Sequence, residues 1–282
     1  MSIEEFVVSR KNTQGPKLFA VVGKAEQPRY AVALIHGYAD HAARYLHVIE
    51  WFREHGITTV ALDLRGHGRS EGGRGYCGNF EEYWDDLAEL DPLLEAHAPN
   101  LPRILFGHSM GGLATASSLL GPRGMHVWRA AVWSAPFFQL ALPVPAIKEK
   151  AAHLLAKIAP KFGMSSGLYG RDLTHDETIA RGYDEDPLVF KKANTKFYVE
   201  AVKMQERLFR EAKAIKLPFF LGFGTGDKVA SPEGAKRFVA AAGSTVKEFK
   251  LYEGLYHEIL NEPSWRDIAG DMKTFMDAHA SS

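Results

Sequence analysis

The chain has 282 residues, of which 46% are hydrophobic and 24% are charged, as is ordinary for a globular protein with a sizeable core. This length suits one large α/β domain with an insertion, or two small domains. The formal net charge of +0 excludes a basic field that would recruit nucleic acid or acidic substrates.

Three features of the sequence bear on the location of the protein. The N-terminus carries Glu4 and Glu5 and lacks the apolar segment of a signal peptide. No apolar run approaches the roughly 20 residues that a membrane helix needs. The single cysteine, Cys77, cannot form an intrachain disulfide, which suits a reducing compartment. We therefore expect a soluble, cytoplasmic protein.

Strand-like and helical segments alternate along the first half of the chain. Two strand-like segments, 3–10 and 17–25, flank residues 12–16, which have the composition of a hairpin turn. The next predicted strands are 30–35, 58–62, 103–106 and 129–133, and the predicted helices are 45–55, 80–96 and 113–120. Such alternation predicts parallel crossovers, and hence an open, doubly wound sheet with helices on both faces.

The alternation stops over residues 136–216 and then resumes. Helices are expected at 143–159 and 194–215 with irregular chain between them, followed by strands at 218–223 and 246–252 and helices at 232–242 and 265–279. We therefore predict an α/β fold whose core, residues 1–135 and 217–282, contains an eight-stranded, mostly parallel sheet. Residues 136–216, which we call the cap, are expected to cover the strand tips, where ligands bind in such folds.

A Gly-x-Ser-x-Gly motif at 107–111 predicts a nucleophilic serine. A short apolar strand precedes the motif and a helix-forming segment follows it, which is the context of a nucleophile elbow. The tight turn lifts the hydroxyl group of Ser109 off the strand tip, and only small residues fit at Gly107 and Gly111. The helix that follows offers unpaired N–H groups and a partial positive charge to an oxyanion. This context disfavours the alternative, a glycine-rich turn without catalysis.

The hydroxyl group of Ser109 needs a base to accept its proton, and the chain has 12 histidines. In this type of fold the acid and then the histidine follow the serine along the chain. His257 is the predicted base because it follows the last predicted strand, whereas His279 lies in the terminal helix. Asp227, which follows the preceding strand, is the predicted acid that orients the imidazole. A helix N-cap is the alternative role for Asp227.

Two backbone N–H groups are predicted to form the oxyanion hole. One belongs to Met110, directly after the nucleophile. The other belongs to Tyr38, in the loop after the strand at 30–35. Gly37 in this loop has no side chain, so the backbone there stays accessible. Losing one such donor costs about 3–4 kcal/mol in the transition state.

Other patterns in the sequence have plainer explanations. Gly-x-Gly-x-x-Gly at 73–78 follows a long loop rather than a strand tip, which disfavours a dinucleotide site. The segment 257–261 begins like a zinc-protease helix but ends in asparagine, which disfavours a metal site. We therefore expect neither a cofactor nor a metal. Three further histidines are interpreted as structural loop residues: His36, His41 and His67.

Four motifs carry a resemblance to a known family. They are Gly-His-Ser-Met-Gly-Gly at 107–112, His-Gly…Arg-Tyr within 36–45, Asp-Leu-Arg-Gly-His-Gly-Arg-Ser-Glu-Gly at 63–72, and Ser-Ala-Pro at 134–136. With these motifs the chain resembles the monoglyceride lipase/lysophospholipase family of α/β-hydrolases, over nearly its whole length and least in the cap. One departure is that residues 36–41 read His-Gly-Tyr-Ala-Asp-His where family members often have His-Gly-x-Gly-Glu-His.

The resemblance implies the α/β-hydrolase fold and assigns the site. It implies a triad of Ser109, Asp227 and His257, with Tyr38 and Met110 as oxyanion donors. It also implies a mobile cap that meets the membrane to collect a single-chain lipid. The expected activity is hydrolysis of monoacylglycerol or lysophospholipid esters through an acyl-enzyme intermediate, by a protein that is cytoplasmic or peripheral at the membrane.

Several alternatives remain open from the sequence. A short-chain carboxylesterase, a thioesterase or an aminopeptidase could use the same scaffold, although proline-iminopeptidase-like relatives tend to show Gly-Gly-Ser-Trp-Gly at the elbow. A carboxylate nucleophile, as in haloalkane dehalogenases, is disfavoured by Ser109. A non-catalytic binding protein is disfavoured by the ordered Ser, Asp and His. The acyl length, head group, regioisomer and oligomeric state are not determined by the sequence.

The first predicted cap helix has an apolar stripe beside lysines. At 100° per residue, one face collects Ile147, Ala151, Leu154, Leu155 and Ile158, and one flank collects Lys150, Lys157 and Lys161. Such a helix suits a lipid interface, with its lysines reaching toward the headgroups. The alternative is that the stripe packs on the sheet.

Overall fold

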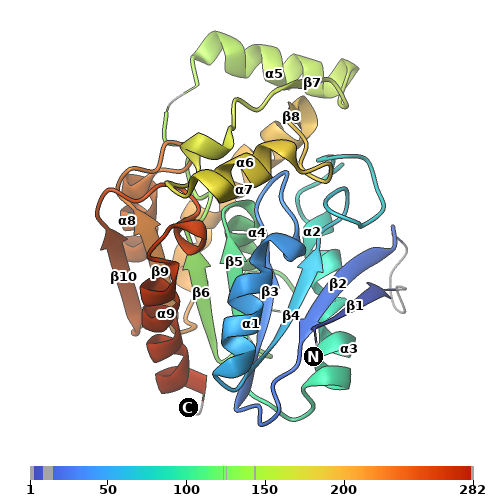
Figure 1. Ribbon diagram of the computed structural model, residues 1–282. Coiled ribbons are helices and arrows are strands. Elements are labelled where there is room, and N and C mark those ends of the chain that lie inside the picture. Colours follow the sequence, from blue (N-terminus) through green and yellow to red (C-terminus); the bar gives the residue numbers. More distant parts are fainter. Residues whose placement is uncertain (1–2, 9–14, 123, 125, 143, 281–282) are drawn as a thin grey trace.

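One eight-stranded sheet forms the centre of the molecule (Figure 1). The computed structural model describes residues 3–8, 15–122, 124, 126–142 and 144–280. The strand order is β1-β2-β4-β3-β5-β6-β9-β10, and β2 pairs antiparallel with β1 and β4 while all other neighbouring pairs are parallel. The strands are β1 (Ile3–Val8), β2 (Leu18–Gly23), β3 (Tyr30–Ile35), β4 (Ile57–Asp63), β5 (Arg103–His108), β6 (Ala130–Ser134), β9 (Phe219–Gly224) and β10 (Lys247–Tyr252).

The predicted eight-stranded, mostly parallel sheet is therefore confirmed. Parts of two sequence predictions, residues 9–10 of the first strand and residues 12–14 of the hairpin turn, lie outside the described residues. Every residue of β2, β3, β4 and β9 is buried, because helices cover both faces of the sheet. Successive side chains enter opposite layers: Leu105 belongs to one apolar cluster and Phe106 to the other.

Two layers of helices cover the sheet (Figure 1). One layer contains α1 (Leu46–Glu54) and α9 (Trp265–Ala280), whose buried residues share a cluster with Phe106. The other layer contains α2 (Glu82–Leu87), α3 (Leu90–His97), α4 (Met110–Ser118), α7 (Thr195–Glu211) and α8 (Pro232–Ala241). Short 3₁₀ helices lie at Ala42–Tyr45, Gly170–Asp172, Ala212–Ala214 and Ile259–Asn261.

The single helix predicted at 80–96 is wrong in one respect, since the structure divides it into α2 and α3. Pro92 lies in the first turn of α3. A proline has no N–H group to donate, and its ring clashes with the carbonyl group four residues earlier, so Pro92 disfavours a continuous helix at this point. The break therefore follows from a residue that the apolar periodicity does not register.

The segment between β6 and β9 lies over the carboxyl edge of the sheet (Figure 1). It contains α5 (Ala146–Ile158), α6 (Glu177–Glu185), α7 and the short antiparallel strands β7 (Gly163–Ser165) and β8 (Lys192–Asn194). Neither α6 nor the two short strands were expected. The side chain of Asp176 accepts hydrogen bonds from the N–H groups of Thr178 and Ile179 and so caps α6.

The cap is not a separate layer throughout. Phe197, Met204 and Leu208 of α7 belong to the same apolar cluster as the sheet, whereas the large side chains of α5 stay outside it. The division of the chain into a core and a cap at residues 136–216 remains our interpretation. Within the described ranges, no helix is both long and apolar enough to cross a membrane.

Candidate active site

The carboxyl end of β5 bends sharply at Ser109. Its backbone has φ 51° and ψ −119°, a left-handed conformation that costs energy for a residue with a side chain. A Cβ atom at Gly107 would collide with Thr115, and one at Gly111 would collide with the backbone of Ile35 and His36. Only glycine fits at these two positions, as the sequence predicts for a nucleophile elbow. The turn is strained so that the hydroxyl group stands clear of the strand.

The structure brings Ser109, His257 and Asp227 together from three different loops. The Oγ atom of Ser109 lies 2.8 Å from Nε2 of His257, and Nδ1 of His257 lies 2.7 Å from Oδ2 of Asp227. Because a carboxylate only accepts hydrogen bonds, Nδ1 carries the proton and Nε2 is free to accept the proton of the serine. All three residues are buried. This arrangement can activate a hydroxyl group for attack on a carbonyl carbon.

Asp227 has two roles, one for each carboxylate oxygen. Its Oδ1 atom accepts hydrogen bonds from the N–H groups of Val229 and Ala230, at 2.7 and 3.0 Å, which orders its own loop. Its Oδ2 atom is left for His257. The N-cap of α8, the alternative role considered for Asp227, belongs to Ser231, which accepts from the N–H group of Gly234.

The environment of His257 favours its charged form. Burial lowers the pKa of the imidazole, but the charge of Asp227, the hydrogen bond to it and the charge of Glu258 outweigh burial and raise that pKa above its usual value. The neighbouring His108, whose ring centroid lies 4.9 Å away, has its pKa lowered to about 4, chiefly by burial. His108 therefore stays neutral at neutral pH, while His257 is prepared to hold a proton taken from Ser109.

The loop after β3 orients the predicted oxyanion donor. Nε2 of His36 accepts from the N–H group of Leu64 at 3.0 Å, so its Nδ1 carries the proton and donates to the carbonyl group of Gly37 at 2.7 Å. The C=O and N–H groups of a trans peptide point in opposite directions. The N–H group of Tyr38 therefore points away from His36. Met110, the other predicted donor, is the first residue of α4, where N–H groups lack partners within the helix.

A buried charge network that sequence reasoning missed joins this loop to the His257 loop. Arg44 donates two hydrogen bonds of 2.7 Å to Glu258 and one of 3.0 Å to Asp40. Asp40 in turn accepts from the hydroxyl group of Tyr45 at 2.9 Å. Burial raises the pKa of Asp40, but the charge of Arg44 and smaller contributions from neighbouring histidines together outweigh it and hold that pKa well below its usual range. The sequence did contain a sign of this network, since Arg44 and Tyr45 belong to the His-Gly…Arg-Tyr motif within 36–45.

The other histidines that the sequence analysis names, His41, His67 and His279, lie outside the hydrogen-bonded triad. His41 pairs with Asp186 of the cap, with Nε2 and Oδ2 2.9 Å apart. Burial lowers the pKa of His67 to about 3, so this side chain is neutral. His279 lies in the last turn of α9.

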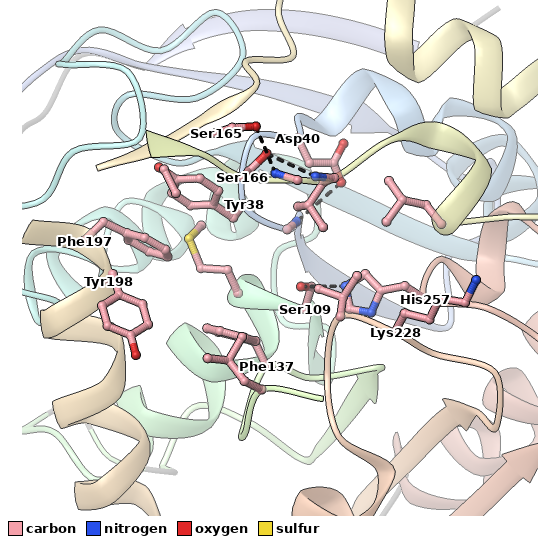
Figure 2. Close-up of a pocket in the computed structure, with 18 of the residues that line it drawn as sticks. Tyr38, Asp40, Ser109, Phe137, Ser165, Ser166, Phe197, Tyr198, Lys228 and His257 are labelled. Carbon is pink, nitrogen blue, oxygen red and sulfur yellow. Dashed lines mark hydrogen bonds between the residues drawn. The ribbon is translucent and has the colours of Figure 1, made fainter. Parts of the chain in front are cut away.

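A cavity of ≈ 390 Å³ opens beside the serine. Figure 2 shows the rings of Tyr38, Phe197 and Tyr198 on one side of Ser109, with His257 on the other. Cap residues, among them those of β7 and the start of α7, form much of its wall. A cavity with aromatic and aliphatic walls and a few polar groups beside the reacting atom suits an apolar chain that ends in an ester.

Known proteins share this fold. The model of a family described as "Serine aminopeptidase, S33" matches residues 26–264. The chain belongs to this family of α/β-hydrolases. It is a carboxylic ester hydrolase.

Individual relatives of this α/β-hydrolase carry lipase names. It is 32% identical to a monoacylglycerol lipase of Mycolicibacterium smegmatis over 89% of each chain. It is 30% identical to the phospholipase YtpA of Bacillus subtilis over 91% of this chain and 98% of that one. The crystal structure of a Paleococcus ferrophilus monoacylglycerol lipase matches with a TM-score of 0.83 and 28% identity, covering 93% of this chain and 99% of that one.

Proposed function

We propose that this hydrolase cleaves the ester bond of monoacylglycerols or lysophospholipids through an acyl-enzyme intermediate on Ser109. The single observation that carries the proposal is the unbroken hydrogen-bond chain from Ser109 through His257 to Asp227, at 2.8 and 2.7 Å, beside an apolar cavity. The relatives named monoacylglycerol lipase and phospholipase support the lipid substrate.

The reaction follows from the positions of these groups. Oγ of Ser109 attacks the ester carbon while Nε2 of His257 takes the hydroxyl proton, and the carbonyl oxygen becomes an oxyanion. The N–H groups of Tyr38 and Met110 donate to this oxyanion. When the tetrahedral intermediate collapses, the C–O bond to the alcohol breaks and His257 returns the proton to the departing oxygen. Water then repeats these steps on the acyl-enzyme and releases the fatty acid.

The aromatic wall of the cavity sets our expectation for the acyl chain. Each buried CH₂ group contributes about 0.8 kcal/mol of transfer free energy, so a medium or long chain binds more tightly than an acetyl group. Phe137, Leu140 and Phe197 line the cavity and offer an apolar surface to such a chain. We therefore infer a preference for medium or long acyl chains.

We infer further that the cap makes transient contact with the membrane surface. Ile147, Leu154 and Ile158 of α5 are 79%, 59% and 70% exposed, while Ala152 on the opposite side of the helix is buried. The stripe therefore does not pack on the sheet, which was the alternative. Lysines 148, 150 and 157 on the same helix are exposed and suit anionic headgroups. A location in the cytoplasm, peripheral to the membrane, remains our prediction.

A peptide substrate is the second candidate, because the family description names an aminopeptidase. An aminopeptidase needs a carboxylate that accepts the free amino group of its substrate. The two buried carboxylates that line the cavity, those of Asp40 and Glu258, are both bonded to Arg44. Their oxygen atoms already accept hydrogen bonds from Arg44 and, for Asp40, from Tyr45, so neither carboxylate is free to receive a charged amino group, which favours an ester over a peptide.

Hydrolysis rates across substrates test the proposal. The panel contains p-nitrophenyl esters and monoacylglycerols with acyl chains from two to eighteen carbons, a lysophospholipid series and an aminoacyl amide. We expect kcat/KM to rise with chain length, with the S109A variant inactive on every substrate. Faster hydrolysis of the aminoacyl amide than of any ester, or activity retained in S109A, would contradict the proposal.

A further inference from the structure

The side chain of Tyr38 joins the oxyanion loop to two other parts of the molecule. Its phenol oxygen lies 3.2 Å from the carbonyl oxygen of Gly75 and 3.3 Å from that of Lys192. The hydroxyl group has one proton, so it donates to one of these carbonyl groups at a time. Gly75 lies in the loop between β4 and α2, and Lys192 is the first residue of β8 in the cap. The phenol group thus stands between core and cap.

Aromatic contacts with the cap hold the ring of Tyr38 in place. The ring stacks on Phe197 with centroids 4.1 Å apart and planes 25° apart, and it meets Phe190 edge-on at 5.3 Å. Figure 2 shows Tyr38 and Phe197 side by side on the cavity wall. A Cβ atom at Gly75 would collide with the phenol group and with Phe190, so the backbone there closes around the tip of the ring.

Asn194 of the cap forms a hydrogen bond with the same carbonyl group, that of Gly75. Its Nδ2 atom donates to the oxygen of Gly75 at 2.5 Å, and its Oδ1 atom accepts from the N–H group of Phe197 at 2.8 Å and so caps α7. The carbonyl oxygen of Gly75 therefore lies within hydrogen-bonding distance of both Asn194 and Tyr38. A displacement of the start of α7 would reach Tyr38 through its ring partner and through this shared acceptor.

The peptide between Gly37 and Tyr38 needs such support. Gly37 has little room for a side chain, because a Cβ atom there would lie 3.2 Å from both His108 and Ser109. A glycine, however, leaves its own backbone torsions less restricted than any other residue does. His36 holds the carbonyl side of the peptide, as described above. The ring of Tyr38 is attached to the next Cα atom, so a fixed ring restricts the other side.

We propose that Tyr38 is a positioning residue: its side chain fixes the Gly37–Tyr38 peptide so that the N–H group of this peptide faces the oxyanion. The same side chain makes the orientation of this donor depend on the position of the cap. The inference rests on the proposed function. It adds that a wall residue of the cavity acts on the rate of the chemical step. A residue that only shaped the acyl site would act on substrate binding.

Three variants measured on a short soluble ester separate these roles. The ester is p-nitrophenyl acetate, which does not extend along the cavity. Y38A removes the ring, Y38F keeps the ring and removes the phenol contacts, and Y76A is the matched control. Tyr76 lies in the same loop as Gly75 and faces the cap at Lys161, 5.6 Å from ring centroid to Nζ. The second readout is the inhibition constant of an alkyl boronic acid, whose adduct with Ser109 resembles the tetrahedral intermediate.

We expect Y38A to lower kcat about 10²-fold, which approaches the loss of one oxyanion donor. KM should change little, and the inhibition constant of the boronic acid should rise by the same factor as kcat falls. Y38F should show the same pattern at a smaller size, and Y76A should match the unmodified enzyme. An effect of Y38A on KM alone, or a kcat and boronate affinity within twofold of those of Y76A, would overturn the proposal. Y38F covers the case in which Y38A does not fold.

Phe190 tests the connection to the cap. F190L removes the aromatic contact between the cap and Tyr38, and it changes no residue of the oxyanion loop. If Phe190 acts through Tyr38, F190L lowers kcat on its own, and the Y38A/F190L double variant is no slower than Y38A. Additive losses would contradict the connection. Activity that survives S109A would reject the proposed function itself, whereas an inactive S109A with an unaffected Y38A rejects only the role of Tyr38.

Discussion

The sheet core and the cap use apolar side chains in opposite ways. In the core, whole strands such as β3 and β9 are buried from end to end. In the cap, the stretch from Leu142 to Tyr169 carries seven of the eleven large hydrophobic side chains that are exposed among the described residues. Contiguous apolar patches are rare on the surfaces of monomeric soluble proteins and mark interaction sites, which agrees with the membrane contact that we propose for the cap.

We propose from this contrast that chemistry and substrate capture lie in different parts of this chain. The predicted triad and oxyanion donors all lie just beyond the carboxyl ends of core strands, in loops or, for Met110, at the start of α4, and closely packed apolar layers hold these strands in place. The cap supplies cavity walls and the exposed apolar surface. Substitutions in the core site should therefore affect every substrate alike, whereas substitutions on the outer cap should affect only substrates that arrive from a lipid surface.

The largest expected effect comes from the triad in the core. S109A and H257A should each lower kcat on the order of 10⁶-fold, and the double variant should lose no more, because the two residues act as one unit. D227N should cost about 10⁴-fold, because Oδ2 of Asp227 sets the tautomer of His257. Rates are measured on one soluble and one micellar ester, and the loss should be equal on both.

A loss of rate on the micellar ester alone would mean that Ser109 or His257 acts in substrate capture. It would contradict the assignment of chemistry to the core and capture to the cap. Labelling by a fluorophosphonate probe supplies the control. The unmodified enzyme should react and S109A should not, while equal labelling of both would reject Ser109 as the nucleophile.

The next largest effect should come from α5 in the cap. L154S and I158S each remove an exposed apolar side chain, which we expect to weaken binding to anionic liposomes roughly tenfold per residue and about 10²-fold together. Hydrolysis of a short soluble ester should stay within twofold. Leu155, although part of the same predicted stripe, is only partly exposed and makes a poorer test.

Val7 offers the matched control for the cap substitutions. It is 68% exposed but lies on β1, at the edge of the core sheet. V7S should therefore leave liposome binding unchanged. Proportional losses of liposome binding and soluble-ester hydrolysis in L154S/I158S would mean that α5 supports the fold instead.

A smaller effect concerns pH. His257 must be neutral to accept the serine proton, and the raised pKa means that kcat/KM starts to fall at a higher pH than for an ordinary histidine of pKa near 6.5. Glu258 contributes to this rise. E258Q, which keeps the shape of the side chain, should move the acid limb of the profile to lower pH. An acid limb that stays in place or moves to higher pH would contradict this electrostatic account.

The smallest effect is expected at Ala39 in the loop that follows β3. Ala39 has φ 59°, in the left-handed region that costs a residue with a Cβ atom roughly 1–2 kcal/mol, and glycine is common there in the related motif. Replacing Ala39 with glycine relieves this cost, but the greater freedom of glycine in the unfolded state offsets about 0.5–1 kcal/mol of the relief. A39G should therefore stabilise the protein by at most about 1.5 kcal/mol, seen as a higher urea midpoint with an unchanged m-value. A lower midpoint would contradict strain at Ala39.

Much of the core could be predicted because its signals are local. The strand that leads to Ser109 is an apolar run, and the glycines at 107 and 111 reflect close contacts that exclude any side chain. The order of Ser109, Asp227 and His257 along the chain follows from the order of the strands that carry them. Pro92 is the exception, since one residue divided a helix that the apolar periodicity had joined.

The cap was harder to predict because its contacts are not local. The helix α6 is short, and its N-cap Asp176 was the only clear signal for it. β7 and β8 are three residues each and pair across a long stretch of chain. Neither the exposure of Leu154 nor the partial burial of Leu155 could be told from periodicity, since both residues lie on the same apolar face of the helical wheel.

The sequence by itself determined the sheet, the elbow and the three residues that the structure joins by hydrogen bonds, because apolar runs, glycines and chain order are local properties. Only the tertiary structure decided which groups surround them. Arg44 meets Glu258 across 214 positions, and Tyr38 meets Lys192 across 154. Such contacts depend on how layers pack, and no pattern of neighbouring residues encodes a distance between segments so far apart in the chain.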